Sequence, residues 1–371
     1  MERLLLLVCL ILYKFILVEF VIIIEDFNMK KRVLITGGAG FIAHHVVYHF
    51  LINTDWEIVT LDRLDLSGNL NRLADVIARN PEFKSRIKFV FHDLKAEIST
   101  LTQNFIGEIN YILHLAAGSH VDRSIEFPME FVMDNVVGTT NILEFARKHK
   151  SLERFIYFST DEIFGVAPEG VDYKERDRYN STNPYSASKA AGEELCVAYE
   201  NTYGTPIFIT HTMNVFGERQ HPEKFIPLCI RRARDGDTVF IHSNADKTQA
   251  GSRHYIHASD VADAMLFLLN LDNPSIYEPD YGNAKCPKFN VVGKEEIDNL
   301  SLAKMIAAAA GKELSYEMID FHTSRPGHDL RYALSGEYMK SLGWEPKVSL
   351  QERISEVVHW SLDNQEWIEL A

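Results

Sequence analysis

Short apolar runs alternate with longer stretches of mixed polarity through the first half of the chain. The runs are rich in Val, Ile, Leu and Phe and stop at glycine or polar residues, as the buried strands of a parallel sheet do. The predicted strands are Arg32–Thr36, Glu57–Leu61, Ile87–Phe91, Tyr111–Leu115, Phe155–Phe158 and Ile207–Thr210. Helical patterns lie between them, from the turn after Thr36 through Phe50, at Asn135–His149 and at Ala187–Tyr203. Strands that alternate with helices predict a Rossmann-like, doubly wound parallel α/β sheet.

The pattern changes at about residue 214, where the elements become shorter. Helices are predicted at Pro222–Asp235, Ser259–Leu271, Ser301–Ala309 and Leu350–Trp360. We therefore expect a Rossmann domain at residues 29–213 and a smaller C-terminal domain at residues 214–371. A segment at about 254–272 is expected to return to the first domain.

Residues 1–28 form a hydrophobic N-terminal extension. From Leu4 to Ile24 the chain is apolar apart from Lys14 and Glu19. The aliphatic and Phe side chains would favour membrane insertion by about 5 to 10 kcal/mol, and the two charges would oppose it by about 5 to 7 kcal/mol. Hydrophobicity alone therefore does not decide whether this stretch is a membrane anchor.

Met29 opens a segment, Met-Lys-Lys-Arg-Val-Leu-Ile-Thr-Gly, that is a natural start for a nucleotide-binding domain. The first 28 residues are then interpreted in three ways: as an upstream extension, as an anchor or as a cleaved signal. If residues 4–24 span a membrane, the cluster Lys30, Lys31 and Arg32 would keep the following domain in the cytosol. We expect a cytoplasmic protein, with membrane contact only if residues 4–24 act as an anchor.

Composition and charge narrow the classes of partner. The chain has 371 residues, of which 46% are hydrophobic and 24% charged, as in ordinary globular proteins. A formal net charge of −14 argues against nucleic acid as a partner, because phosphate binding needs a basic surface. The four cysteines lack the close spacing of a metal site or a disulfide framework, so no metal is expected.

The segment Gly37–Ala43, Gly-Gly-Ala-Gly-Phe-Ile-Ala, lies at a predicted strand-to-helix turn. Glycine there lets the backbone approach a pyrophosphate at the helix N-terminus, and a small third residue permits close helix–sheet packing. The candidate cofactor contacts are Gly37, Gly40, Phe41 and Ile42. Alone the pattern is weak, because glycine-rich turns are common.

Asp62 strengthens this interpretation, because it stands at the end of the second predicted strand. An acidic residue there accepts the ribose hydroxyls and repels a 2′-phosphate, which favours NAD over NADP. Asp93 and Leu94 follow the third strand and suit the adenine edge, although Asp93 is equally interpreted as a strand-end cap. Ala116 and Ala117 follow the fourth strand and are small enough for a cofactor to lie against. Residues 29–213 are therefore predicted to bind NAD.

Tyr185 and Lys189 are four residues apart in a predicted helical segment, so both lie on one helix face. An adjacent cation favours the phenolate and lowers the pKa of a tyrosine from its usual value near ~10. Such a pair can take a hydroxyl proton while a hydride leaves the same carbon.

A second acidic motif, Thr160-Asp161-Glu162, ends the fifth predicted strand. Two carboxyl groups at a strand end are often a solvated turn, and a lone Tyr-x-x-x-Lys occurs by chance. Both motifs in order after a glycine turn are less easily explained by chance. They indicate an oxidation followed by proton transfer at a neighbouring carbon.

These residues carry a family resemblance that extends from Met29 to nearly the end of the chain. The chain resembles the extended short-chain dehydrogenases that act on nucleotide sugars, and most of all the dTDP-glucose and UDP-glucose 4,6-dehydratases. The matching segments are Thr36–Ile42, Ala116–Ile125, Ser159–Gly165, Asn183–Ala191, Pro222–Pro227 and Arg325–Asp329. The Thr-Asp-Glu triplet separates these dehydratases from related 4-epimerases and decarboxylases, which usually carry small or hydroxyl residues there.

The resemblance implies a lyase that converts dTDP-glucose to dTDP-4-keto-6-deoxyglucose and water with NAD as cofactor. Tyr185 would take the proton of the 4-hydroxyl, Lys189 would hold the nicotinamide ribose and lower the tyrosine pKa, and Thr160 would hydrogen-bond the 4-oxygen. Glu162 would remove the proton on carbon 5 and Asp161 would protonate the departing 6-hydroxyl. A UDP-glucose 4,6-dehydratase, a nucleotide-sugar 4-epimerase and a non-catalytic NAD-binding module are the alternatives.

The resemblance also implies contacts to a nucleotide-diphosphate sugar. They carry over to Ser119, His120, Asn214, Lys224, Arg253, Asn290, Arg325 and His328. The planar fork of arginine suits a diphosphate, whereas Asn290 and His328 are equally interpreted as turn or capping residues. A structural role at a strand end fits Ser119 and His120 as well. A homodimer is the family norm, through the helices near Asn135–His149 and Ala187–Tyr203.

Three departures from the family pattern lie where nucleotide or sugar would be held. Gly118 replaces the usual Glu or Gln, Phe164 replaces a common Tyr, and the loop Ser243–Ser252 is longer than usual. One methyl group separates thymine from uracil and is worth only about 1 to 3 kcal/mol in a fitted pocket. The preference for thymine or uracil therefore stays open.

Overall fold

A seven-stranded parallel sheet organises the larger part of the molecule. The computed structural model describes residues 30–271, 286–320 and 331–369. The strands run in the order β10-β6-β5-β4-β1-β2-β3, and every neighbouring pair is parallel. Their bounds are β1 Arg32–Thr36, β2 Glu57–Asp62, β3 Ile87–Phe91, β4 Tyr111–His114, β5 Arg154–Thr160, β6 Ile207–Thr212 and β10 Lys288–Val291. The predicted doubly wound fold is confirmed.

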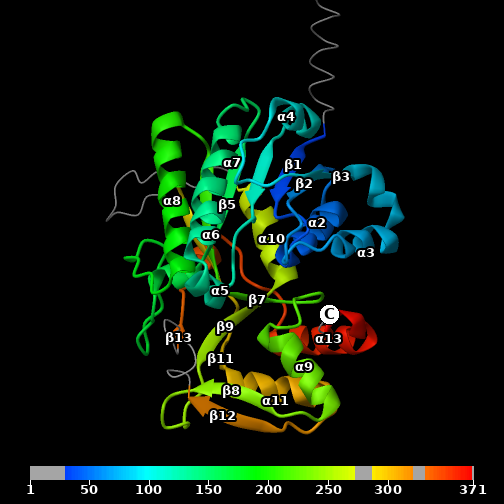
Figure 1. The fold of residues 1–371 in the computed structure, drawn as a ribbon, viewed down its shortest axis with the longest axis vertical. Coiled ribbons are helices and arrows are strands. Elements are labelled where there is room, and N and C mark those ends of the chain that lie inside the picture. The colour runs from blue at the N-terminus through cyan, green and yellow to red at the C-terminus, as the bar shows by residue number, and fades with distance from the viewer. Residues whose placement is uncertain (1–29, 272–285, 321–330, 370–371) are drawn as a thin grey trace, which may run out of the picture.

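Helices cover both faces of this sheet (Figure 1). One face packs against α2 (Phe41–Asn53) and α10 (Ala258–Leu269), whose Val46, Phe50 and Met265 are buried in one core cluster. The other face packs against α4 (Thr100–Ile106), α7 (Gly138–Ala146) and α8 (Pro184–Tyr203). Further short elements are α3 Asn71–Arg79, η1 Pro81–Arg86, α5 Val121–Glu126, α6 Pro128–Val132, η2 Met133–Val137 and η3 Asp161–Phe164.

A second, smaller region lies beyond one end of the sheet, in the lower half of Figure 1. Its core is built around Ile230, Ile306 and Ile354, which come from three different helices. Its strands are β7 Asn214–Phe216, β8 Val239–Ser243, β9 Ser252–His257, β11 Glu296–Asp298, β12 Tyr316–Asp320 and β13 Arg331–Tyr332. Its helices are α9 Phe225–Asp235, α11 Asn299–Ala309, α13 Leu350–Asp363 and η4 Gln365–Trp367, while α12 Glu337–Ser341 packs near β10.

Two segments from the second half of the chain return to the sheet. α10 packs along α2, in the segment where the sequence predicts a return to the first domain. Strand β10 adds a seventh strand beside β6, which the sequence pattern did not predict. The division at residue 214 stays a prediction.

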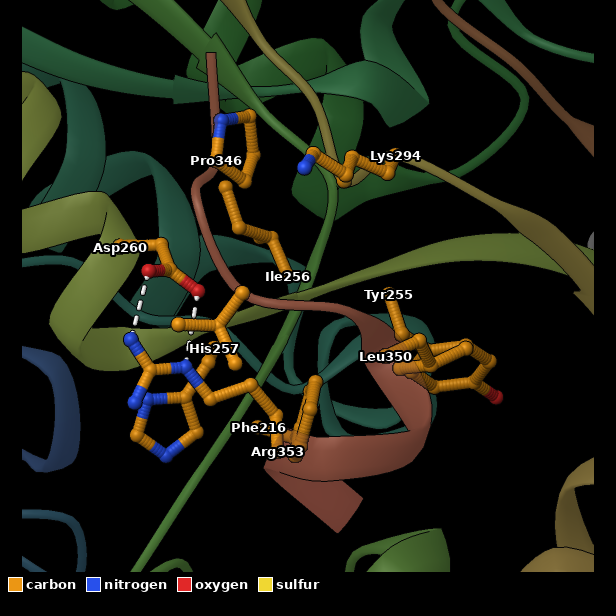
Figure 2. A pocket seen from close by; sticks show the side chains of 11 residues that line it. Phe216, Tyr255, Ile256, His257, Asp260, Lys294, Pro346, Leu350 and Arg353 are labelled. Atoms are coloured by element: carbon orange, nitrogen blue, oxygen red, sulfur yellow. Dashed lines mark hydrogen bonds and ion pairs between the residues drawn. The ribbon is translucent and has the colours of Figure 1, made fainter.

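A small cavity marks the junction between the two regions. It measures about 10 Å³, room for at most one water molecule. Figure 2 shows Asp260 on α10 and Arg353 on α13 pointing toward each other beside it, with 2.8 Å between Arg353 Nη2 and Asp260 Oδ1. This partly buried ion pair links α13 to α10, and the cavity is too small to hold a substrate.

The described residues contain no helix that is both long and apolar enough to cross a membrane. The extension at residues 1–28, with its possible anchor at 4–24, lies outside the described residues, as do Arg325 and His328.

Candidate active site

The glycine turn between β1 and α2 is shaped by close backbone contacts. Gly37 has φ +68°, and a Cβ there would lie 2.9 Å from Ala116 Cα. A Cβ on Gly38 would lie 2.4 Å from Thr60 Cβ. No larger residue fits either position without moving strands β2 or β4. The turn therefore brings bare backbone to the carboxyl end of the sheet, where ligands bind in folds of this type.

The first turn of α2 can receive an anion. Gly40 is the N-cap, no side chain caps the helix, and no acidic residue lies in its first turn. Its first amide groups have no acceptor within the helix and carry the positive end of the helix dipole. This turn fits the pyrophosphate of a dinucleotide, because glycine leaves space and the amides supply hydrogen-bond donors.

Asp62 sits beside this turn at the end of β2. Its Oδ2 accepts the amide of Ala39 at 3.0 Å and its Oδ1 accepts the amide of Leu64 at 2.8 Å. Burial raises the pKa of this carboxyl, while the two amides lower it. Each oxygen keeps a lone pair that could accept a hydroxyl of a ribose.

Arg63, the next residue, is held by three carboxylates that the sequence pattern did not connect. Its Nη1 and Nη2 lie 2.5 Å and 2.7 Å from the two oxygens of Asp134, and its Nε lies 2.9 Å from Asp65. Its Nη1 is also 3.6 Å from Asp93. These carboxylates raise the pKa of the Arg63 guanidinium and occupy its donors. Asp93 also accepts a hydrogen bond from the Lys95 amide at 2.9 Å. The next residue, Leu94, is buried.

Helix α8 carries the Tyr-Lys pair, and its start is strongly determined by sequence. Asn183 and Ser186 form a reciprocal capping box, Pro184 occupies the first turn, and Gly204 ends the helix with φ +70°. The Tyr185 amide also donates to Ser124 Oγ on α5 at 3.1 Å. This hydrogen bond fixes the start of α8 against α5.

The two side chains of the pair do not shift each other's pKa in the way the sequence predicts. Lys189 Nζ donates to the Phe158 carbonyl at 2.7 Å and lies over the Tyr157 ring. Burial lowers the pKa of Lys189 to about 8. Burial raises the pKa of Tyr185, as do the charges of Glu162 and Asp161, and only a hydrogen bond with Thr160 lowers it.

The Thr-Asp-Glu triplet comes together with Tyr185. Thr160 ends β5 and caps the short helix η3, where its Oγ1 accepts the Glu162 amide at 3.3 Å and donates to Asp161 Oδ1 at 3.0 Å. The other oxygen of Asp161 is buried and has no hydrogen-bond partner among the residues that the structure describes. A buried carboxyl oxygen without a partner is costly, so we expect it to hold a proton or to meet a ligand hydroxyl.

The carboxyl pair retains a proton near neutral pH. Burial raises the pKa of Asp161 to about 6, against smaller effects of Thr160 and Arg253. Burial and the charge of Asp161 raise the pKa of Glu162 to about 7. Because the pKa of Glu162 is the higher of the two, a proton held by the pair near neutral pH sits more often on Glu162 than on Asp161 in the protein without substrate.

Two buried asparagines hold this site together and were missed by the sequence patterns. Asn183 Nδ2 donates to Glu162 Oε2 at 3.1 Å. Asn135 lies in the π-helical turn η2, where it accepts the Gly118 amide at 2.8 Å and donates to Ser188 Oγ at 2.9 Å. The sequence indicates Asn183 only as part of a segment that matches the family, because the contact that gives it a role joins residues 21 apart.

Most of the predicted substrate contacts lie in three places: on the side of the carboxyl pair, at the start of β7 and just before α5. The charges of Arg253 on β9 and Lys224 at the N-cap of α9 act on Glu162, so both cations lie on the side of the carboxyl pair. Asn214 begins β7, which pairs with β9. Ser119 is exposed, and His120 caps α5, where its Nδ1 accepts the Arg123 amide at 3.5 Å.

The predicted cofactor contacts Ala116 and Ala117 are half-buried beside the glycine turn.

The side chain of Asn290 makes its hydrogen bonds to other residues of the protein. Its side chain is fully buried in β10, where Nδ2 donates to the carbonyls of Tyr173 and Ser335 at 3.0 Å and 3.1 Å. Its Oδ1 pairs with His211 Nδ1 at 2.9 Å. Both amide hydrogens are therefore engaged, which leaves no side-chain donor for a sugar nucleotide.

Comparison with known proteins identifies the family of this chain. A model of the family described as GDP-mannose 4,6 dehydratase matches residues 34–357. The chain belongs to this family. The predicted membership of the extended short-chain dehydrogenases is confirmed.

Several relatives are named dTDP-glucose 4,6-dehydratase. The one from Escherichia coli is 33% identical over 91% of this chain and 95% of its own length. The enzyme of that name from Streptomyces venezuelae, solved with NAD and TYD bound, has a TM-score of 0.77 and 32% identity over 91% of this chain and 99% of its own. A UDP-glucose 4-epimerase from Thermus thermophilus, solved with NAD, has a TM-score of 0.75 and 28% identity over 88% and 98% of the two chains.

The raised pKa of Asp161 predicts that the native carboxyl destabilises the fold at neutral pH. Its pKa is about 6 in the folded chain and 3.8 ordinarily, so its stabilising contribution is present below about pH 4 and is lost as the pH rises through about 6. Asp161→Asn is neutral at every pH and escapes this loss. We expect the variant to be more stable by about 3 kcal/mol at pH 7.5 and by almost nothing near pH 4.

Urea unfolding of both proteins at the two pH values measures this difference. Asp177→Asn is the control, because Asp177 accepts the Lys174 amide in an exposed turn. An Asp161→Asn variant that gains no stability at pH 7.5 would contradict the argument.

Proposed function

We propose that this protein is an NAD-dependent nucleotide-sugar 4,6-dehydratase that converts dTDP-glucose to dTDP-4-keto-6-deoxyglucose and water. The observation that carries the proposal is the contact set of Tyr185, Thr160, Asp161 and Glu162 at the end of β5. An alcohol oxidation alone needs the tyrosine and the lysine. The two buried carboxyls with raised pKa values supply the extra acid and base that a dehydration needs.

The chain has the residues to hold NAD at the carboxyl end of the sheet. Gly37, Gly40, Phe41 and Ile42 would hold the pyrophosphate, and Asp62 would accept hydroxyls of the adenosine ribose. Asp93 and Leu94 would lie near the adenine, and Ala116 and Ala117 are small enough for the cofactor to lie against. NAD, when bound, accepts a hydride from carbon 4 of the sugar and later returns it to carbon 6.

Tyr185 acts first, as the base that takes the proton of the 4-hydroxyl. Thr160 hydrogen-bonds the 4-oxygen from the end of β5, because its hydroxyl already meets Tyr185 there. Lys189 is buried one helical turn from Tyr185, and its proposed task is to hold the nicotinamide ribose of bound NAD.

The carboxyl pair acts next, on the neighbouring carbons. A ketone at carbon 4 acidifies the hydrogen on carbon 5, which Glu162 removes. For this step the proton of the pair must be on Asp161, with Glu162 ionised, and Asp161 then donates it to the departing 6-hydroxyl so that water leaves. The unpartnered buried oxygen of Asp161 is the atom placed to make that contact.

The sugar nucleotide is proposed to bind between the two regions of the fold. Arg253 and Lys224 bring positive charge to the side of Glu162, and a diphosphate would be attracted to them. Asn214, Ser119 and His120 stay proposed contacts. Arg325 and His328 stay proposals that lie outside the described residues.

Product mass tests the proposal. Protein that begins at Met29 is incubated with dTDP-glucose or UDP-glucose and a catalytic amount of NAD, and each sugar nucleotide is analysed by mass spectrometry. Loss of one water without net consumption of NAD supports the proposal, and the faster substrate gives the base preference. An unchanged mass with inversion at carbon 4 would instead establish an epimerase, the activity named for one relative of similar fold.

We also propose a homodimer and a cytoplasmic location. Met129 on α6 is 68% exposed, and Val132 and Met133 beside it are exposed as well, so this face carries apolar side chains to solvent. Figure 1 shows α6 and α7 beside α8 on the outer side of the sheet. A second copy of this face could cover them.

The Arg63 contacts predict how the protein discriminates between NAD and NADP. Asp62→Ser removes the charge that repels a 2′-phosphate, but the guanidinium of Arg63 stays bound to Asp134 and Asp65. We expect Asp62→Ser alone to bind NADP weakly. Adding Asp134→Asn should strengthen NADP binding roughly tenfold, because two charged donors become available.

Calorimetric titration of each variant with NADP and NAD measures the effect. Asp65→Asn in the Asp62→Ser background is the matched comparison, because Asp65 is more exposed than Asp134 and should release Arg63 less. Equal NADP affinity in Asp62→Ser and Asp62→Ser/Asp134→Asn would sink the explanation.

A further inference from the structure

Helix α8 carries a third ionisable residue on the face of the Tyr-Lys pair. Tyr185, Lys189 and Glu193 follow at intervals of four, so they form one line along the helix. The Glu193 side chain is 0% exposed. The proposed mechanism uses the first two residues and leaves this buried carboxylate without a task.

Glu193 is surrounded by hydrogen-bonding and charged groups from four other parts of the chain. Ser159 Oγ on β5 donates to Oε1 at 2.5 Å, and the Tyr179 hydroxyl donates to Oε2. Lys288 Nζ on β10 lies 3.2 Å from Oε2, and His211 Nε2 on β6 lies 3.3 Å from it. Burial alone would raise the pKa of Glu193, but the contacts with His211, Lys288 and Ser159 outweigh it and lower the pKa to about 2. The group is therefore a carboxylate at any pH at which the enzyme works.

Within the described part of the chain, Glu193 is the one carboxylate whose charge acts on Lys189. Lys189 Nζ faces the Phe158 carbonyl and the ring of Tyr157 on β5. From its own helix the charge of Glu193 favours the ammonium form, while burial raises the pKa of the Cys196 thiol and keeps it neutral. From β4 it faces His114, whose pKa burial lowers to about 3, so that ring is neutral. Among the described residues that act on Lys189, Glu193 alone carries a full negative charge near neutral pH.

We propose that Glu193 is a positioning residue, which holds Lys189 as an ammonium ion and fixes Ser159 next to Thr160. The proposal rests on the proposed function, because it gives the lysine cation a task. Burial pulls Lys189 toward the neutral amine, and Glu193 opposes this from one helical turn away. The same carboxylate clamps the strand residue that precedes the Thr-Asp-Glu triplet. One buried group thus supports both halves of the site.

Lys288 makes the proposal testable, because substitutions at Glu193 and at Lys288 should shift the pKa of Lys189 in opposite directions. Glu193→Gln keeps the shape and removes the negative charge, so the pKa of Lys189 should fall by roughly one unit. Lys288→Met removes a positive charge from the same cluster and leaves Glu193, so the pKa of Lys189 should rise. Loss of packing alone would not move the titration of Lys189 in opposite directions in the two variants.

The experiment is a titration of the Lys189 side chain by NMR in protein labelled with ¹⁵N-lysine, with Lys189→Met to assign the signal. It needs neither substrate nor turnover, so a failure of the proposed dehydratase activity would be recognised separately by the product-mass test. A parallel readout is the pH dependence of carbon-4 oxidation in a single turnover, whose alkaline limb should move with the Lys189 titration.

Opposite shifts in Glu193→Gln and Lys288→Met support the proposal. Shifts in the same direction, or no shift in either variant, overturn it. If Glu193→Gln does not fold, the double variant Glu193→Gln/Lys288→Met keeps the cluster without net charge change. In that protein the pKa of Lys189 should still be lower than in Lys288→Met. Equal pKa values of Lys189 in these two variants would overturn the proposal as well.

Discussion

Tyr185→Phe should lower the rate of dehydration by roughly a factor of 10² to 10⁴, the usual contribution of a positioned acid–base group. The variant keeps the ring and loses the hydroxyl that meets Thr160 at the end of β5. Without a base for the 4-hydroxyl proton, carbon 4 is not oxidised and neither later step begins. Binding of NAD and of the sugar nucleotide should change little, because the ring still fills its place. Single-turnover formation of reduced nicotinamide measures the step directly.

Tyr199→Phe is the matched control on the same helix. Its hydroxyl donates to Glu144 at 2.6 Å, on the part of α8 away from the Thr-Asp-Glu triplet. We expect this variant to keep its activity. A Tyr185→Phe enzyme within tenfold of the native rate would mean that another group takes the proton.

The second large effect is a separation of oxidation from dehydration. Asp161→Asn and Glu162→Gln should each lower product formation roughly 10²-fold or more, while oxidation at carbon 4 continues. Asn and Gln keep the hydrogen-bonding shape but can neither donate nor take a proton here. The pair carries raised pKa values because of burial, and both substitutions remove this titration.

The two variants should also differ from each other. In Glu162→Gln the base for carbon 5 is missing, so carbon 5 should not exchange its hydrogen with deuterated water. In Asp161→Asn the base remains and exchange should continue without loss of water. Equal exchange in both variants would contradict the division of roles between the two carboxyls.

The chemistry of the site could be predicted from the sequence because its residues lie in short local patterns. Tyr185 and Lys189 are one helical turn apart, and Thr160, Asp161 and Glu162 are consecutive. The glycine turn and Asp62 follow from strand ends in the same way. The parallel sheet was predictable because its strands are short apolar runs, and central strands such as β1 and β4 are buried on both faces.

The supporting contacts could not be predicted, because they join distant segments. Arg63 meets Asp134, which is 71 residues away, and Glu193 meets Lys288, which is 95 residues away. The helix predicted at Asn135–His149 in fact starts with a π-helical turn over Met133–Val137, which lets Asn135 reach Gly118 and Ser188. No pattern of apolar positions indicates such a turn.

The Lys189 environment shows why pairwise reasoning from spacing is incomplete. The spacing predicts a lysine beside the tyrosine, but the Phe158 carbonyl takes its ammonium group. The pKa of Tyr185 is set by burial and by Glu162 and Asp161. Only the folded chain brings these groups together.

The most direct test of the central claim is to follow the hydrogen of carbon 4. dTDP-glucose with deuterium at carbon 4 is converted by the native enzyme, and the product is examined by NMR. The dehydratase mechanism predicts that the deuterium is found on carbon 6 of a 4-keto-6-deoxy sugar. Deuterium that stays on carbon 4, in glucose or in its 4-epimer, would contradict it.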